Sequence, residues 1–92
     1  MNAIKLLENI KLIRARKNLA EERGERDLNA EYQISCFENC KNALYRRERK
    51  VLELYYEKDF TQAQVATEIG VSTSTVTRVV KEIKEKFKIM LQ

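Results

Sequence analysis

The sequence predicts an all-α protein of four to five helices, with a helix-turn-helix in its C-terminal half and a helical segment for support or oligomerisation before it. Three observations lead to this prediction. The 92 residues include no Pro and only two Gly. Apolar side chains recur along the chain at steps of three and four, the period of a helix packed on one side. No segment shows the alternating pattern of a β-strand.

The first helix is expected from residue 2 to about residue 22, because strong helix formers fill this segment and Gly24 follows it. One apolar row consists of Ala3, Leu6, Leu7, Ile10 and Ile13. A second row on the opposite side consists of Leu12, Ala15 and Leu19. A helix that is apolar on two sides needs two partners. We expect these to be its own domain and a second subunit, the alternative being a helix wedged into a single core.

A charged turn at residues 24–29 should separate this helix from a second one, which is expected from about Ala30 to Leu44. The core face of the second helix should carry Tyr32, Cys36, Phe37, Cys40, Ala43 and Leu44. The two cysteines are interpreted as small apolar side chains in a reducing cell. Because the chain has no His, it does not complete a four-ligand zinc site alone, and only thiols shared across a dimer would provide one.

A third helix is expected from about Arg46 to Lys58. It should bury Val51, Leu52 and Leu54, together with either Tyr55 or Tyr56. Its first turns carry the cations Arg46, Arg47, Arg49 and Lys50. Cations at a helix N-terminus oppose the macrodipole, so their position indicates an anionic partner. The alternative is one continuous helix from Ala30, in which these cations would not lie at an N-terminus.

Residues 61–84 have the spacing of a helix-turn-helix. Thr61 and Gln64 match a capping box, so a short helix should begin at Gln62. Gly70 is placed to end that helix in a left-handed conformation, and Ser72 is placed to cap the next helix.

Small and apolar residues in the same stretch fit two crossing helices. Ala66 provides the small side chain at the crossing, and Val76 anchors the second helix on the first. The apolar row then continues through Val79, Val80, Ile83 and Phe87 to Met90 or Leu91. This geometry favours DNA binding, with the second helix in the major groove and the first across the backbone.

A set of residues between 44 and 84 matches a known pattern: Arg47, Glu48, Arg49, Val51, Leu52, Leu54, Tyr55, Tyr56, Thr61, Val65, Ala66, Ile69, Gly70, Val71, Ser72 and Val76. With these residues the segment resembles region 4, the promoter-reading domain of bacterial sigma factors, and the small phage or mobile-element regulators similar to it. The resemblance implies a role in transcription, with a second surface that docks on RNA polymerase.

Two features depart from the region 4 pattern. The family usually has a Leu-Pro step before its Arg-Glu-Arg run, whereas Tyr45 follows Leu44 here. The arginine-rich start of the recognition helix is replaced by Thr73, Ser74 and Thr75. The run STSTVTRV is similar to recognition helices of Trp-repressor-like regulators, which bind operators as dimers. Nothing in residues 1–43 resembles the sigma region that melts promoters.

The candidate DNA contacts follow from position. On the second helix of the motif they are Ser72, Thr73, Ser74, Thr77, Arg78 and Lys81. Arg78 alone has a guanidinium that grips guanine with two hydrogen bonds. Gln62 is placed for a phosphate, and Arg47 and Lys50 are further phosphate candidates. The cations of the first helix, Lys11, Arg14, Arg16 and Lys17, are expected to be solvated instead.

These observations predict a sequence-specific transcription regulator that binds double-stranded DNA as a homodimer, with RNA polymerase as a further candidate partner. Residues 1–43 would support or dimerise it, and residues 44–92 would bind DNA. The alternatives are the DNA-recognition subunit of a phage packaging machine (small terminase type) and a sigma-like module that only binds RNA polymerase. We expect no enzyme activity, cofactor or metal, because the chain has no His and no phosphate-binding loop. The absence of a long apolar run or signal peptide predicts a cytoplasmic protein with no membrane partner.

Overall fold

The computed structural model describes residues 1–92, and all its regular elements are helices. In chain order they are α1 (Ala3–Glu22), α2 (Leu28–Asn42), α3 (Arg46–Leu52), the π-helical turn η1 (Glu53–Glu57), α4 (Gln62–Ile69) and α5 (Thr73–Met90). The predicted all-α class is confirmed.

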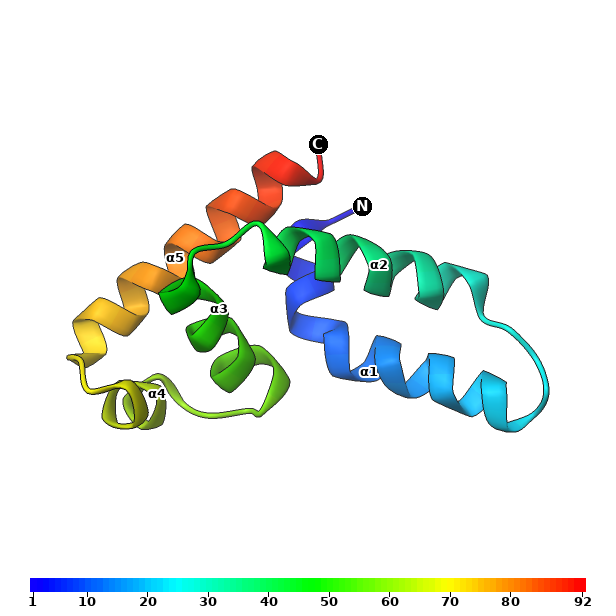
Figure 1. Ribbon diagram of the computed structural model, residues 1–92, viewed down its shortest axis with the longest axis horizontal. Helices are drawn as coiled ribbons and strands as arrows, with labels where there is room; N and C mark the ends of the chain where they lie inside the picture. The colour runs from blue at the N-terminus through cyan, green and yellow to red at the C-terminus, as the bar shows by residue number, and fades with distance from the viewer.

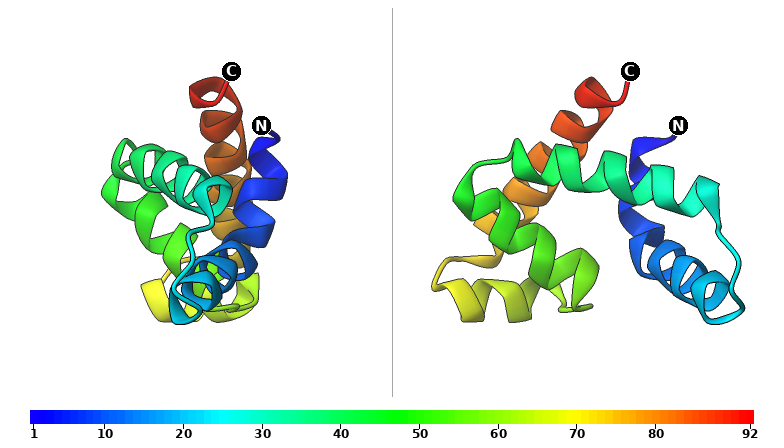
Figure 2. Two further views of the ribbon diagram at one scale, coloured as in Figure 1. Left: turned by 90° about the vertical axis from the view of Figure 1, so that its right-hand side faces the viewer. Right: turned by 45° about the vertical axis from the view of Figure 1, so that its right-hand side comes forward.

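The molecule is elongated, with extents of 45 × 27 × 19 Å. Helices α1 and α2 form an antiparallel hairpin that extends to one side, while α3, α4 and α5 form the other side (Figure 1). Helix α5 begins at the end of the molecule farthest from the hairpin tip, and its last turns lie near the N-terminus (Figures 1 and 2). The hairpin and the helix-turn-helix therefore occupy opposite ends of the long axis.

Short polar side chains set where the first two helices begin. The Oδ1 of Asn2 accepts the Lys5 N–H at 3.1 Å, and the Oδ1 of Asp27 accepts the Ala30 N–H at 2.9 Å. The Ala30 N–H lowers the pKa of Asp27, and the Arg16 guanidinium adds to the effect. The second helix begins two residues earlier than predicted, because Asp27 is a strong N-cap. The sequence prediction had assigned Asp27 to the turn at residues 24–29.

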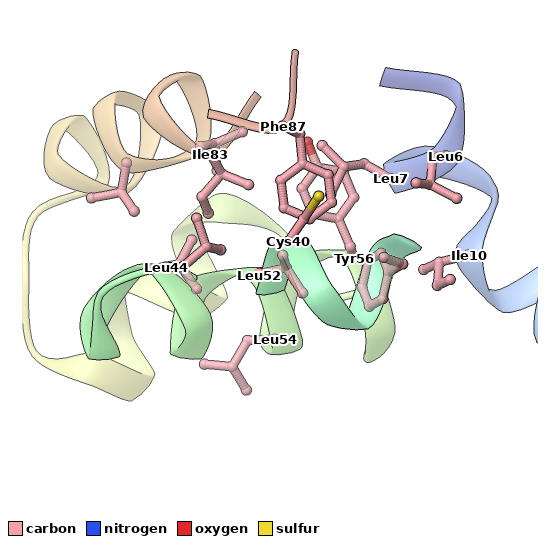
Figure 3. Close-up of a cluster of buried hydrophobic side chains, with 14 of the residues drawn as sticks. Leu6, Leu7, Ile10, Cys40, Leu44, Leu52, Leu54, Tyr56, Ile83 and Phe87 are labelled. Atoms are coloured by element: carbon pink, nitrogen blue, oxygen red, sulfur yellow. The ribbon is translucent and has the colours of Figure 1, made fainter. Parts of the chain in front are cut away.

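One core connects all the helices. Its largest fully buried side chains include Phe37 of α2 and Phe87 of α5, whose rings meet edge to face at 5.9 Å. Figure 3 shows Phe87 and Ile83 of α5 above Cys40 and Leu52. The first apolar row of α1 and the predicted row of α5 as far as Phe87 are buried as expected: Ala3, Leu6, Leu7, Ile10 and Ile13, then Val76, Val79, Val80, Ile83 and Phe87. At the end of that row, Met90 is 38% exposed and Leu91 is half-buried against the core. The second row of α1 lies outside this core, with Leu12 61% and Leu19 48% exposed.

Two residues predicted for the core face of the second helix are exposed, so the prediction was wrong there. Tyr32 is 63% exposed, because at 100° per residue it lies almost opposite the buried Phe37. Ala43 is exposed because α2 ends at Asn42 and Ala43 is its C-cap. Leu44 does reach the core, but from the connection after the helix.

The predicted third helix is not a regular α-helix over its whole length. After Leu52 it widens into η1, in which the Lys58 N–H donates to the Glu53 carbonyl at 3.0 Å. The Phe60 N–H then donates to the Leu54 carbonyl at 2.9 Å, with Asp59 in a left-handed conformation between them (φ 57°). An apolar pattern does not report such a local widening. The widened turn η1 buries Tyr56; the sequence predicts burial of either Tyr55 or Tyr56.

Partly exposed ion pairs connect α1 with α2 and the hairpin with η1. Arg14 of α1 pairs with Glu38 of α2 and with Glu57 of η1, and its guanidinium lies 5.5 Å from the centre of the Phe37 ring. Lys41 of α2 also pairs with Glu57, at 3.1 Å. The hairpin is thus tied to η1 by charged as well as apolar contacts.

The helices and side chains of the chain also bear on membrane and metal sites. No helix is long and apolar enough to span a membrane. No group of three or more His, Cys, Asp or Glu residues is arranged to hold a metal ion. Cys40 is buried and Cys36 half-buried, and both are free thiols.

Candidate nucleic-acid interface

The beginning and end of α4 are built as the sequence predicted. The Thr61 hydroxyl accepts the Gln64 N–H at 3.1 Å, and the Gln64 side chain accepts the Thr61 N–H at 2.8 Å. Gly70 ends the helix with φ 74° and ψ 40°. This is a left-handed conformation in which any residue that has a Cβ is strained. The Gly70 N–H donates to the Ala66 carbonyl at 2.9 Å. The capping box and the glycine cap are both confirmed.

The start of α5 is fixed by Ser72. Its hydroxyl accepts the Thr75 N–H at 3.2 Å and lies 2.9 Å from the Thr75 hydroxyl. Val76 is fully buried where α5 meets α4, and Ala66 is 5% exposed. The small side chain at the crossing lets the two helices approach closely, which sets the angle at which α5 leaves the turn. Ser72 is therefore a cap first, and its hydroxyl is already in use.

The outer face of α5 carries the other predicted contact residues. Thr73, Ser74, Thr77, Arg78 and Lys81 are all exposed on the side opposite the buried valines. Neither Arg78 nor Lys81 forms a salt bridge or a side-chain hydrogen bond within the chain. This face thus has hydroxyl groups at its start and two free cations one and two turns further on.

Two predicted site residues from different helices contact each other. The Thr77 hydroxyl of α5 is hydrogen-bonded to the side-chain amide of Gln62, the first residue of α4. The same hydroxyl lies 3.1 Å from the Thr73 carbonyl. The Gln62 Oε1 and the Thr73 carbonyl are both acceptors, so they share the single proton of the Thr77 hydroxyl. The position of Gln62 at the start of α4 is thus linked to the recognition face of α5.

Arg47 and Lys50 lie at a second surface, beside the turn of the motif. Together with Arg46 they surround a hollow whose apolar floor is formed by Ile69 and Val71. Helix α2 ends before α3 begins, so these cations do stand at the start of a separate helix. No acidic side chain of the chain pairs with any cation of α3. The hollow places them next to the residues that lead into Ser72.

The cluster of cations at residues 11–17 of α1 differs from the cations of α3 and from Arg78 and Lys81 of α5. Each cation of the predicted solvated cluster has a carboxylate partner: Lys11 pairs with Asp59, Arg14 with Glu38 and Glu57, Arg16 with Asp27, and Lys17 with Glu21. Positive charge without an internal counter-ion is therefore concentrated around the helix-turn-helix. Such charge is available to phosphate groups.

The sequence model of "Sigma-70, region 4" matches residues 42–88, slightly more than half of the chain. The chain belongs to the sigma-70 region 4 family. The matched segment begins at the end of α2 and includes α3, η1, α4 and nearly all of α5. Membership makes this segment a DNA-binding helix-turn-helix of the kind used in transcription.

This region 4 protein is also similar to a curated protein, the sorbitol operon regulator of Klebsiella pneumoniae. The two are 46% identical over 37 residues, which is 40% of this chain and 12% of the regulator. The chain therefore matches only a small part of that relative. No solved structure matches the chain.

The structure adds one candidate that was not named among the phosphate contacts predicted from the sequence. Arg46 lines the same hollow as Arg47 and Lys50 and, like them, is exposed. The spacing of four residues between Arg46 and Lys50 was the available signal, since such residues lie on one side of a helix.

Proposed function

We propose that this chain is a sequence-specific transcription regulator that reads DNA with the first turns of α5 in the major groove. The observation that supports this most directly is the separation of charge described above. Lys11, Arg14, Arg16 and Lys17 of α1 are paired with carboxylates, whereas Arg78 and Lys81 on α5 and the cations of α3 are free. A surface rich in free cations and hydroxyls fits a polyanion with readable base edges.

Each part of the surface has a separate role in the proposal. Arg78 forms two hydrogen bonds to a guanine, and Thr73 and Ser74 contact bases or phosphates at the entry of the helix. Gln62, held by Thr77, donates to a phosphate on the strand beside α4. Arg47 and Lys50, with Arg46, neutralise phosphates beside the turn.

Selection of bound fragments from random DNA, followed by gel shifts, tests the function. We expect an enriched site with a guanine whose preference is lost in Arg78→Ala. That variant should relax discrimination at one position by about 1–3 kcal/mol while weakening non-specific binding little. The variant Arg47→Ala/Lys50→Ala should instead weaken binding to all sequences and reduce the slope of log K against log salt by up to about 2. Failure to enrich any sequence would refute the proposal.

We further propose that the chain works as a homodimer, with residues 1–43 as the dimerisation segment and residues 44–92 as the DNA-binding domain. Specific binding exceeds non-specific binding by about 4–10 kcal/mol in typical regulators. One bidentate arginine and a few hydroxyls fall short of that range, so a second copy on a palindromic site would supply the difference.

The same experiments distinguish the alternative functions. A chain that binds RNA polymerase but no DNA would be a protein-binding module. A ring of many subunits would favour a DNA-packaging subunit, because packaging assemblies need rotational symmetry around the DNA.

A further inference from the structure

One face of the α1–α2 hairpin is apolar and unoccupied. Five of the eight large apolar side chains that the chain exposes belong to this hairpin and its first residue: Met1, Leu12, Leu19, Leu28 and Tyr32. They line two grooves between α1 and α2, the first containing Met1, Leu12 and Tyr32 and the second containing Leu19 and Leu28. Arg16 lines both, so the grooves adjoin. We call this surface the hairpin groove.

We infer that the hairpin groove binds the hairpin groove of a second copy of this chain. This inference rests on the proposed function, because it names the surface through which the proposed homodimer forms. The size is suitable. Eleven residues line the first groove and eight the second, with Arg16 in both, so the 18 different residues come slightly short of the roughly 20–30 residues per side of a standard interface. A monomer of 92 residues gains nothing from keeping five large apolar side chains in water on one face.

Polar groups along the groove also favour a second copy. Gln33 lines the first groove, and its buried side-chain oxygen has no hydrogen-bond donor within the chain. A donor from a docked chain would satisfy that oxygen after a small rotation of the side chain.

Two unpaired charges of opposite sign lie at the two ends of the groove. Lys5 lies at one end, and Glu25 lies at the other beside Arg23; none of the three has a salt-bridge partner within the chain. A two-fold axis that makes the hairpins antiparallel places each Lys5 end against the Glu25 end of the other copy. The pairing therefore satisfies charges that a monomer leaves open.

This arrangement determines the spacing of the DNA half-sites. The recognition helix begins at the end of the molecule opposite the hairpin tip (Figure 1), and the long axis is 45 Å. Helix α1, with 20 residues, is about 30 Å long. Two molecules whose hairpins overlap over that length place their recognition helices roughly 60 Å apart. Since both must reach the same side of the duplex, the nearest fit is about two helical turns, or roughly 20–21 base pairs between half-site centres.

Sedimentation equilibrium of the full chain tests the inference. The wild type should be a dimer at tens of micromolar, and Leu12→Glu should raise the dimer dissociation constant by at least about tenfold, with Tyr32→Glu as a second variant. Ile89→Glu is the matched control, because Ile89 is 67% exposed but lines neither groove. Far-UV circular dichroism should show unchanged helix content in all variants.

Three outcomes would overturn this interface. The first is a monomeric wild type, and the second is that Leu12→Glu and Tyr32→Glu both dimerise as tightly as wild type. The third is that Ile89→Glu loses as much dimer affinity as the groove variants. Binding of a selected DNA by the same proteins separates this from the proposed function. A monomeric wild type that still selects a sequence would refute only the dimer. A dimer that selects no sequence would refute only the DNA-reading role.

Discussion

The buried carboxylate of Glu48 provides the sharpest test of how α3 is held on α5. Glu48 is 4% exposed and is the only buried charged residue. Its Oε1 accepts the Tyr45 N–H at 2.9 Å, which caps α3, and the Lys86 Nζ of α5 at 2.8 Å. The Lys86 ammonium also lies 4.1 Å from the centre of the Tyr45 ring. One oxygen thus joins the start of α3 to the second half of α5.

Replacing Glu48 with Ala removes both interactions. Loss of a helix cap costs about 0.5–2 kcal/mol. A hydrogen bond to a charged group contributes about 1.5–3 kcal/mol, and the partial exposure of Lys86 places this one at the low end. We therefore expect Glu48→Ala to lower the free energy of unfolding by about 2–4 kcal/mol. That is a large part of the roughly 5–14 kcal/mol expected for 92 residues.

Urea denaturation followed by far-UV circular dichroism measures this loss. Glu48→Gln keeps an acceptor for the Tyr45 N–H but removes the charge, so it should lose about half as much. Glu85→Ala is the control, because Glu85 is exposed and pairs only with Lys88, at 3.5 Å. If Glu48→Ala unfolds within about 0.5 kcal/mol of wild type, the pair does not hold α3 on α5 and the reasoning is wrong.

Three further predictions follow from single residues or pairs. Gly70→Ala should destabilise the chain by about 1 kcal/mol, because no atom lies near the added Cβ and the cost comes only from the left-handed backbone; a neutral effect in thermal unfolding would contradict this. Thr77→Val should weaken DNA binding when introduced into the wild type but add no further loss in a Gln62→Ala background. Affinities measured by fluorescence anisotropy check this, and additive losses of affinity would show that the pair does not act together. Burial raises the pKa of Tyr56 to about 12, with smaller contributions from Tyr55 and Glu8. The contribution of Tyr56 to folding stability is therefore full below pH about 10, where the hydroxyl is neutral in both states, and declines as the pH rises toward 12. Tyr56→Phe should remove that alkaline decline and, because the buried hydroxyl has no partner, leave stability at neutral pH equal or slightly higher; an unchanged decline would assign it to other groups.

Local signals account for how well the helix-turn-helix was predicted. Thr61, Gly70 and Ser72 act through hydrogen bonds and backbone angles within four residues of themselves, so their roles follow from spacing alone. The apolar row of α5 is equally local, because it depends only on the period of a helix. Ser72 and Thr77 as DNA contacts remain predictions, and the structure adds that both hydroxyls already have partners within the motif.

Features that depend on distant parts of the chain were not visible in the sequence. Glu48 and Lys86 are 38 residues apart, and only the packing of α3 on α5 makes them a pair. Tyr32 fits an apolar face by residue type, but the rotation of α2 about its axis was decided by Phe37 packing on Phe87. The widened turn η1 likewise depends on Phe60 returning to the Leu54 carbonyl.

The sequence by itself determined the helical class, the motif from Thr61 to Lys84 and the two apolar rows of the first helix, because period and capping are properties of neighbouring residues. The tertiary structure alone decided which cations are free. Lys11, Arg14 and Arg16 of α1 meet carboxylates from outside this helix, whereas Arg78, Lys81 and the cations of α3 meet none. It also decided that Leu12 and Leu19 lie outside the core of the chain, since a core of this size covers only one side of α1.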